Sequence, residues 1–209
     1  MVRRRYFFVV NYIPAHVDCG LLAGRCISTL HGFLRHHTDV HIGVSFPEWS
    51  NKTLGRSIAF VSARRTDLEL ICGRSYFQIM EADNLFTISP VLNVPDECHD
   101  VRYVRNQNVA KIFPAERRRR LERAKRRAEG RGEIFQPRAP AELKQIDFFH
   151  TIFMQSSSNG QNYVLHIQKR ECEYRTDDIF SRYGLSSNEI HTGSVPELNA
   201  VLPTLLLKG

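Results

Sequence analysis

The stretch RYFFVVNYIPAHVDCGLLAGRCISTLHGFLRHH, residues 5–37, decides the fold because its hydrophobic pattern changes period halfway along. Residues 5–13 are mostly aromatic or β-branched, which is typical of a buried strand, and Pro14 ends that run. Asp18 is a suitable N-cap for a helix that extends to about residue 37. The helix has apolar side chains at three- and four-residue spacing, which predicts one buried stripe: Leu22, Ala23, Cys26, Ile27, Leu30, Phe33 and Leu34.

The next elements follow from apolar runs separated by turn residues. They are a strand at 40–46, a strand at 57–62, a helix at 66–73 and strands at 75–80 and 84–89. The resulting β-α-β-β-α-β order is that of a ferredoxin-like (RRM-like) fold, and we expect residues 1–95 to form such a domain. Residues 5–13 carry no clear RNP motif, so RNA stacking on the sheet face is not supported.

The second half of the chain, residues 96–209, is expected to form a separate C-terminal domain, which makes the protein α+β. Residues 90–107 are expected to be irregular because Pro90 and Pro95 break any regular element. The remaining elements are a helix at about 114–131, a linker at 133–145, a hairpin of strands 147–155 and 162–170 around the loop SSSNGQ, and a last strand at 179–187.

The charge of the chain is concentrated in the helix predicted at 114–131. The net formal charge is +7, and residues 117–131 hold nine Lys or Arg and two Glu, so the rest of the chain nets to zero. Arg120, Arg123 and Arg127 fall along one face of this helix. A concentrated basic face is typical of a nucleic-acid-binding surface, and the alternative is a solvated helix face.

Cysteine usage and hydropathy favour a cytoplasmic protein. The five cysteines are odd in number and contain no CxxC pair, so neither a disulfide framework nor a structural zinc site is expected. No apolar stretch approaches the length of a membrane span, and Phe7–Val10 is too short for a signal sequence. No Walker loop, HExxH, nucleophile elbow or paired-carboxylate pattern is present, so we expect no metal and no cofactor.

Four motifs in order resemble the type I-F CRISPR pre-crRNA processing endoribonucleases (Cas6/Csy4-like). They are HIGVSFPEW (41–49) with Leu54-Gly55 after it, the arginine-rich helix at 116–127, SSSNGQNYVLHI (156–167) and RYGLSS (182–187). Two further segments, YFQIME (76–81) and GRGEIFQP (130–137), are similar to the branch associated with CRISPR-guided transposons. No single motif is unique, but four in this order are specific.

This resemblance implies a metal-independent endoribonuclease from the cytoplasm of a bacterium. The RNA's own 2′-hydroxyl attacks the adjacent phosphate at the base of a repeat hairpin and leaves a 2′,3′-cyclic phosphate. The protein then stays bound to the 3′ hairpin of the crRNA, as a subunit of a Cascade-type complex. Implied partners are the other Cascade subunits, including the Cas7-type backbone, and a TniQ-type transposition adaptor. The apolar tail at 200–207 is a candidate contact, and packing onto its own domain is the alternative.

The resemblance places the catalytic histidine at His31, in STLHGF. The ordinary pKa of histidine is near 6.5, which suits it to take a proton from a 2′-hydroxyl or to give one to the leaving oxygen. A partly buried core histidine is the alternative. His36 and His37 are rivals at the end of the same helix, where solvation is expected.

The same resemblance assigns a serine and a tyrosine to the catalytic set. The serine maps to Ser156, and a slip within the run to Ser157 or Ser158 remains open. It holds the 2′-hydroxyl in place. The tyrosine maps to Tyr183 in RYGLS, where it orients the histidine, and a packed strand tyrosine is the alternative.

RNA-binding residues are implied in three places. Tyr163 stacks on the closing base pair, where better-studied relatives carry Phe. Arg105 and Gln107 read guanine and adenine through paired hydrogen bonds. One family position on the helix falls on Ala124, where Arg123 or Lys125 is the substitute. The helix residues expected to contact RNA are Arg117, Arg119, Arg120, Arg123 and Arg127.

Two other functions compete with this interpretation. One is a non-catalytic subunit that binds and caps the crRNA hairpin. The other is an unrelated basic protein, which would bind duplex DNA and hairpin RNA with comparable affinity because its contacts would be mostly to phosphate.

Overall fold

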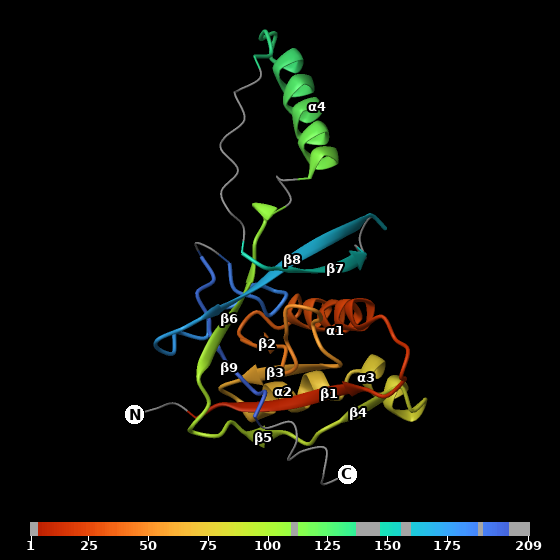
Figure 1. The fold of residues 1–209 in the computed structure, drawn as a ribbon, viewed down its shortest axis with the longest axis vertical. Helices are drawn as coiled ribbons and strands as arrows, with labels where there is room; N and C mark the ends of the chain where they lie inside the picture. The colour runs from red at the N-terminus through yellow and green to blue at the C-terminus, as the bar shows by residue number, and fades with distance from the viewer. Residues whose placement is uncertain (1–3, 110–112, 137–146, 156–159, 188–189, 201–209) are drawn as a thin grey trace.

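Two antiparallel sheets lie on opposite sides of helix α1 in the computed structural model (Figure 1), which describes residues 4–109, 113–136, 147–155, 160–187 and 190–200. The first half contains β1 Tyr6–Tyr12, α1 Cys19–Leu34, β2 Gly43–Ser45, β3 Ser57–Ser62, α2 Arg65–Cys72, α3 Ser75–Ala82, β4 Phe86–Ile88 and β5 Leu92–Asn93. The second half contains β6 Asp100–Arg105, α4 Pro114–Gly130, β7 His150–Gln155, β8 Asn162–Glu171 and β9 Val195–Pro196.

The first sheet confirms the ferredoxin-like prediction. Its strand order is β2-β3-β1-β4, so β1 and β2 are separated by β3, as a split β-α-β unit requires. Every pairing is antiparallel, and Phe8 of β1 faces Phe60 of β3. The four central residues of β1, 7–10, are fully buried, which explains their continuous apolar run.

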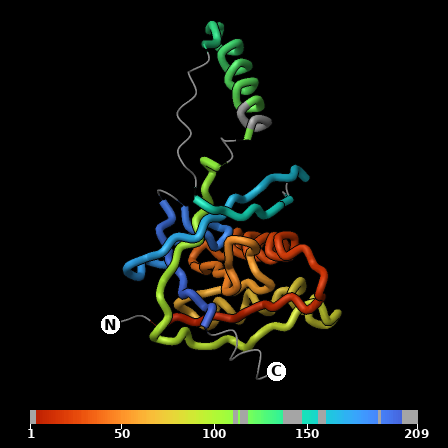
Figure 2. The backbone as a smooth tube through the Cα atoms, viewed as in Figure 1, coloured from red at the N-terminus to blue at the C-terminus, as the bar shows by residue number. Residues whose placement is uncertain are grey.

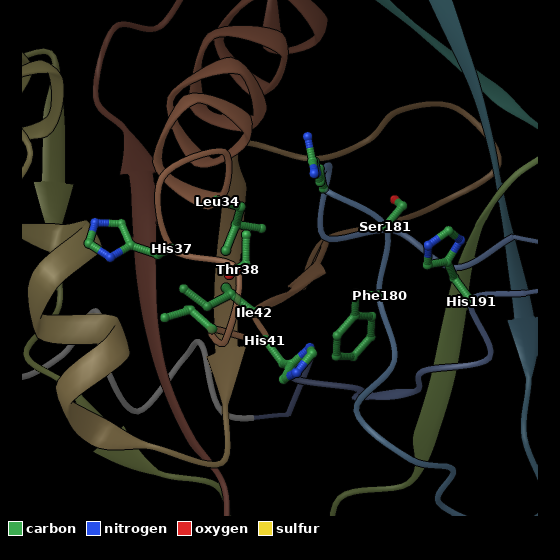
Figure 3. A pocket seen from close by; sticks show the side chains of 10 residues that line it. Leu34, His37, Thr38, His41, Ile42, Phe180, Ser181 and His191 are labelled. Carbon is green, nitrogen blue, oxygen red and sulfur yellow. The ribbon is translucent and has the colours of Figure 1, made fainter.

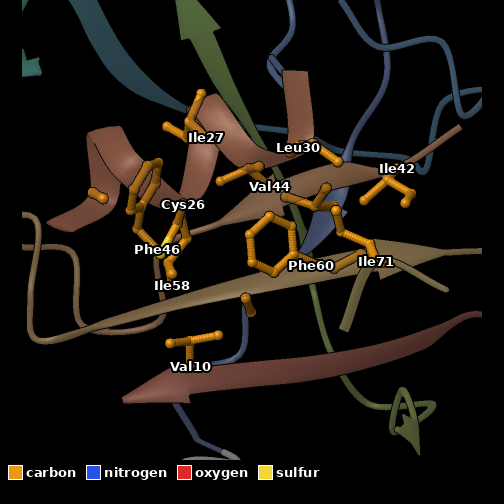
Figure 4. Packing of buried hydrophobic residues seen from close by; sticks show 14 of the residues in the cluster. Val10, Cys26, Ile27, Leu30, Ile42, Val44, Phe46, Ile58, Phe60 and Ile71 are labelled. Atoms are coloured by element: carbon orange, nitrogen blue, oxygen red, sulfur yellow. The ribbon is translucent and has the colours of Figure 1, made fainter. Parts of the chain in front are cut away.

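Helix α1 begins and packs as its sequence predicts. The Asp18 carboxylate accepts a hydrogen bond from the Leu21 amide at 3.0 Å and so caps the first turn. Figure 4 shows Cys26, Ile27 and Leu30 lying over the side chains of the first sheet. The predicted stripe therefore forms the central layer of the core.

The strand predicted at 75–80 is wrong, because these residues form helix α3. Aromatic and β-branched residues favour a strand in isolation, but tertiary packing overrides that weak preference. Tyr76 and Met80, four residues apart, both pack against the core together with the fully buried Phe77. A helix brings residues 76, 77 and 80 to one face, whereas a strand would place Phe77 on the face opposite Tyr76 and Met80.

The second sheet has the order β7-β8-β6-β9 and corrects two expectations. Residues 90–107 were expected to be irregular, yet they contain the two-residue β5 and the six-residue β6, which pairs with both β8 and β9. Residues 179–187 were expected to be a strand, yet they form a turn in which only Ser186 bridges to Val104. The hairpin β7–β8 is confirmed.

Buried contacts join the two sheets into one continuous core. Arg5 at the start of β1 and Asp100 at the start of β6 form a buried ion pair, with 2.5 Å between Nη2 and Oδ1. Gly24 lets α1 approach β7 closely, since a Cβ atom there would lie 2.6 Å from the Phe153 carbonyl oxygen. Both predicted domains contribute to the same hydrophobic cluster, and their division at residue 95 stays a prediction.

Helix α4 stands away from both sheets (Figure 2). Its predicted bounds agree with the structure, with Pro114 at its first turn. Among its described side chains only Ala128 is buried and Ala124 is half-buried. None of the described helices is both long and apolar enough to cross a membrane.

Candidate active site

His31 of α1 lies face to face with Tyr183, from the turn between β8 and β9. Their ring centroids are 4.7 Å apart and their planes differ by 9°. The Arg105 guanidinium carbon, at the end of β6, lies 5.0 Å from the centre of the Tyr183 ring. The Tyr163 hydroxyl of β8 lies 3.2 Å from the Tyr183 hydroxyl. The structure thus brings four of the residues named from the sequence into one cluster.

The turn at 181–185 positions Tyr183 against α1. Gly184 adopts φ = +70°, a left-handed conformation that favours glycine. A Cβ atom on Gly184 would lie 2.6 Å from Val44 Cγ2 and 2.8 Å from Leu30 Cδ2. The carbonyl of Gly184 accepts a hydrogen bond from the Val44 amide at 2.8 Å. The three successive residues YGL therefore have different roles. Tyr183 contacts His31, Gly184 allows close packing on Val44 and Leu30, and Leu185 is buried in the core.

We expect Gly184→Ala to lower the free energy of unfolding by about 2–4 kcal/mol, because it combines backbone strain with overpacking. Gly132→Ala is the matched control, since Gly132 also has φ = +70° but has no heavy atom within 4 Å of the added Cβ. Urea unfolding measures both variants. An equal drop in stability for the two would show that the close approach to α1 and β2 contributes nothing.

Burial lowers the pKa of His31 below its ordinary value, and the nearby cations Arg35, Arg182 and Arg105 lower it further. A hydrogen bond to the backbone of Arg182 raises the pKa of His31 and so offsets part of this lowering. The buried Nδ1 atom has no hydrogen-bond partner among the described residues. At neutral pH the imidazole is therefore largely uncharged, the form that accepts a proton.

Burial, followed by the hydroxyl of Tyr183, raises the pKa of Tyr163 well above its ordinary value. Tyr163 therefore stays a neutral phenol, whose hydroxyl can donate a hydrogen bond to the Tyr183 hydroxyl or accept one from it. The rival histidines lie elsewhere: His36 is exposed, and His37 stacks on Phe33 with 4.3 Å between ring centroids. Neither forms a ring contact with Tyr183.

Ser156, Ser157 and Ser158 lie outside the described residues, so their assignment stays a prediction. The strands that flank them are described, and their last pair is Gln155 with Asn162.

Gln107 is exposed in the turn that follows Arg105 and β6. This turn is anchored by Asn106, a buried residue that the sequence interpretation did not name. Its side-chain amide donates to Gln168 Oε1 at 2.7 Å, and its Oδ1 accepts from the Asn108 amide at 3.0 Å. The NQN sequence is the signal that could have revealed it, because asparagine commonly hydrogen-bonds to the backbone two residues on.

Helix α4 presents an uneven distribution of charge. Its helical period places five arginines on one side, together with Glu116 from the first turn: Arg119, Arg120, Arg123, Arg126 and Arg127. All five are exposed. The opposite side holds Arg118, Glu122, Lys125 and Glu129, and Lys125 Nζ lies 3.8 Å from Glu129 Oε1. Arg117 belongs to the helix, but its side chain is outside the described part.

This distribution favours Arg123 over Lys125 as the substitute for the family position at Ala124, because Arg123 shares the side of Arg120.

Within the described ranges, no group of three or more His, Cys, Asp or Glu side chains could hold a metal ion.

A partly buried histidine stacked on a tyrosine and a separate basic helix on a ferredoxin-like core are the features expected of a protein that processes RNA. The family model described as CRISPR-associated protein (Cas_Csy4) matches residues 11–198, which span both halves of the fold. The chain therefore belongs to the Csy4 family of type I-F CRISPR proteins, which process crRNA. A comparison with curated proteins found no match.

Proposed function

We propose that this protein is a metal-independent endoribonuclease that cuts CRISPR repeat RNA at the base of its hairpin. The observation that carries the proposal is the stacked pair of His31 and Tyr183, in which burial keeps the imidazole uncharged. Neutral imidazole is the form required to take the proton of an attacking hydroxyl.

In the proposed step the 2′-oxygen bonds to the adjacent phosphorus while the bond from phosphorus to the 5′-oxygen breaks. His31 receives the 2′-hydroxyl proton, and the leaving 5′-oxygen takes a proton from solvent. The products are a 2′,3′-cyclic phosphate and a 5′-hydroxyl. Tyr183 covers one face of the imidazole and limits its rotation. The serine of the 156–158 run is assigned to hold the 2′-hydroxyl in line for attack.

Hairpin binding is assigned to the exposed arginine side of α4, to Arg105 and Gln107 beside it in sequence, and to Tyr163. Arg105 lies over the Tyr183 ring and so connects the binding surface to His31. Groups that grip the hairpin at its base would also fix the scissile phosphate near the histidine, which supports retention of the 3′ hairpin after cleavage.

We further propose that the bound protein is a subunit of a bacterial Cascade-type complex that contacts Cas7-type backbone subunits. The transposon branch and its TniQ-type adaptor rest on the resemblance of residues 76–81 and 130–137. Most of the tail at 200–207 lies outside the described residues, so its contact stays a prediction.

A second candidate, a non-catalytic subunit that caps the hairpin, is favoured by one observation. No described residue makes a hydrogen bond to the buried Nδ1 of His31, so that ring nitrogen lacks the partner expected of a general base held ready for proton transfer.

Cleavage of an end-labelled repeat RNA from the same locus, in excess EDTA, tests the proposal. We expect a single cut at the 3′ base of the hairpin that leaves a cyclic phosphate. Binding without a cut would favour the capping subunit. Requirement for an added divalent ion would contradict the metal-independent step.

A further inference from the structure

A cavity of about 220 Å³ adjoins the His31–Tyr183 pair. Leu34 in its lining lies one helical turn beyond His31, and Arg182 in its lining directly precedes Tyr183. The cavity therefore opens next to the place where the scissile phosphate is proposed to lie. Figure 3 shows its two walls, one from the end of α1 and the segment after it (Leu34, Thr38, Ile42), the other from Phe180 and Ser181.

The lining offers groups that bind an anion. Arg182 is cationic, the rings of His37, His41 and His191 offer N–H donors, and none of the ten lining residues is acidic. Arg182 is exposed and forms no ion pair within the described part of the chain. The buried hydroxyl of Ser181 has no hydrogen-bond partner among the described residues. Unused donors without a carboxylate suit a phosphate group.

The size of the cavity limits what it can hold. Pockets for whole small ligands usually measure about 300–1,000 Å³, so this cavity fits only part of a nucleotide. The Phe180 ring in one wall offers a surface for a sugar or a base. The lining therefore suits one nucleotide unit of a longer strand better than a free cofactor.

A second cavity shares His41 with the first but has the opposite charge balance. Its lining contains four aspartates (Asp39, Asp67, Asp177, Asp178) and two arginines. Both arginines are already paired, Arg64 with Asp67 at 2.9 Å and Arg175 with Asp178 at 3.3 Å. Carboxylates there would repel a phosphate chain, so the second cavity is unfavourable for the RNA backbone.

We propose that the first cavity binds the phosphate that follows the first nucleotide beyond the cut, in the strand that leaves after the reaction. This inference rests on the proposed function, because in-line attack needs the RNA to be held on both sides of the scissile phosphate. The hairpin is held on one side of the phosphate, and Arg182 and His41 hold the backbone on the other. They act as positioning residues for the 5′-oxygen leaving group.

Two RNAs test this assignment: the hairpin ending a single nucleotide beyond the cut, and the same hairpin with a longer single-stranded 3′ extension. We expect kcat/KM of the unaltered protein to favour the extended RNA by about tenfold, the value of one charge-assisted hydrogen bond. Arg182→Ala and His41→Ala should bring this ratio close to one. The ratio is the readout because Arg182 also affects His31, and that effect acts on both RNAs alike.

His16→Ala is the matched control, because His16 is exposed and lies before α1, outside the cavity lining. It should keep the ratio. Binding of the same two RNAs with a 2′-deoxy group at the cut site repeats the comparison without cleavage. The affinity ratio of the two RNAs should fall as salt is added. A plot of its logarithm against the logarithm of the salt concentration should have a slope of about −0.7 for each additional phosphate bound.

Equal binding of the two RNAs by the unaltered protein, or a preference that survives both substitutions, would overturn the assignment. Absence of cleavage with the binding preference intact would instead refute the proposed enzyme and leave the cavity's ligand supported.

Discussion

His31→Ala is expected to slow cleavage of the repeat hairpin by on the order of 10²–10⁴-fold, the usual contribution of a general acid or base. Hairpin affinity should change little, because His31 is only partly exposed and helix α4 stands away from α1, which carries His31 (Figure 1). Single-turnover cleavage and equilibrium binding, measured on the same preparation, separate the two effects.

His36→Ala provides the matched control, since His36 follows the same helix end but is exposed and lies outside the lining of the first cavity. With the single-nucleotide RNA it should cleave within about threefold of the unaltered protein, as expected for a residue outside the chemical step. An equal slowing by His31→Ala and His36→Ala would contradict the assignment of His31.

The lowered pKa of His31 gives the cleavage reaction a defined pH dependence. The neutral imidazole accepts the proton, so kcat/KM should rise with pH through the pKa of the free protein and then level off. Because burial and nearby cations lower that pKa, the midpoint should lie below 6.5. A rate that falls as pH rises through this range would mean that protonated His31 acts as the acid instead.

The double variant Arg120→Ala/Arg123→Ala is expected to weaken hairpin binding by about 30- to 300-fold, because it removes two charge-assisted hydrogen bonds of roughly 1–1.7 kcal/mol each. Alanine preserves helix propensity, so the weaker binding reflects the missing guanidinium groups rather than unfolding of α4. The log–log salt slope should fall by about 0.7–0.9 for each phosphate that is no longer bound. Filter binding across a salt series measures both quantities.

Arg118→Ala/Lys125→Ala removes the same charge from the opposite side of α4, where Lys125 faces Glu129. We expect it to weaken binding by less than about fivefold, since it removes only longer-range attraction. If the two double variants behave alike, the helix attracts RNA as a diffuse charge and the assignment of one arginine side is wrong.

Elements with a strong local signal could be predicted from the sequence. The signals are the apolar run of β1, the three- and four-residue spacing in α1, the Asn-Gly pair in the sequence between β7 and β8, and the basic composition of α4. Each of them acts within a few residues. The predictions failed where local preference and packing disagree. Helix α3 carries strand-favouring aromatics, and β6 follows Pro90 and Pro95, which favour irregular structure.

The sequence by itself determined that a basic helix accompanies a ferredoxin-like core, because period and charge are properties of neighbouring residues. The resemblance named His31, Tyr183, Tyr163 and Arg105, but only the tertiary structure decided that they meet. That meeting depends on Gly184, whose missing side chain lets the turn approach Leu30 and Val44. Such a contact joins segments that are distant in the chain, so a pattern of neighbouring residues cannot predict it.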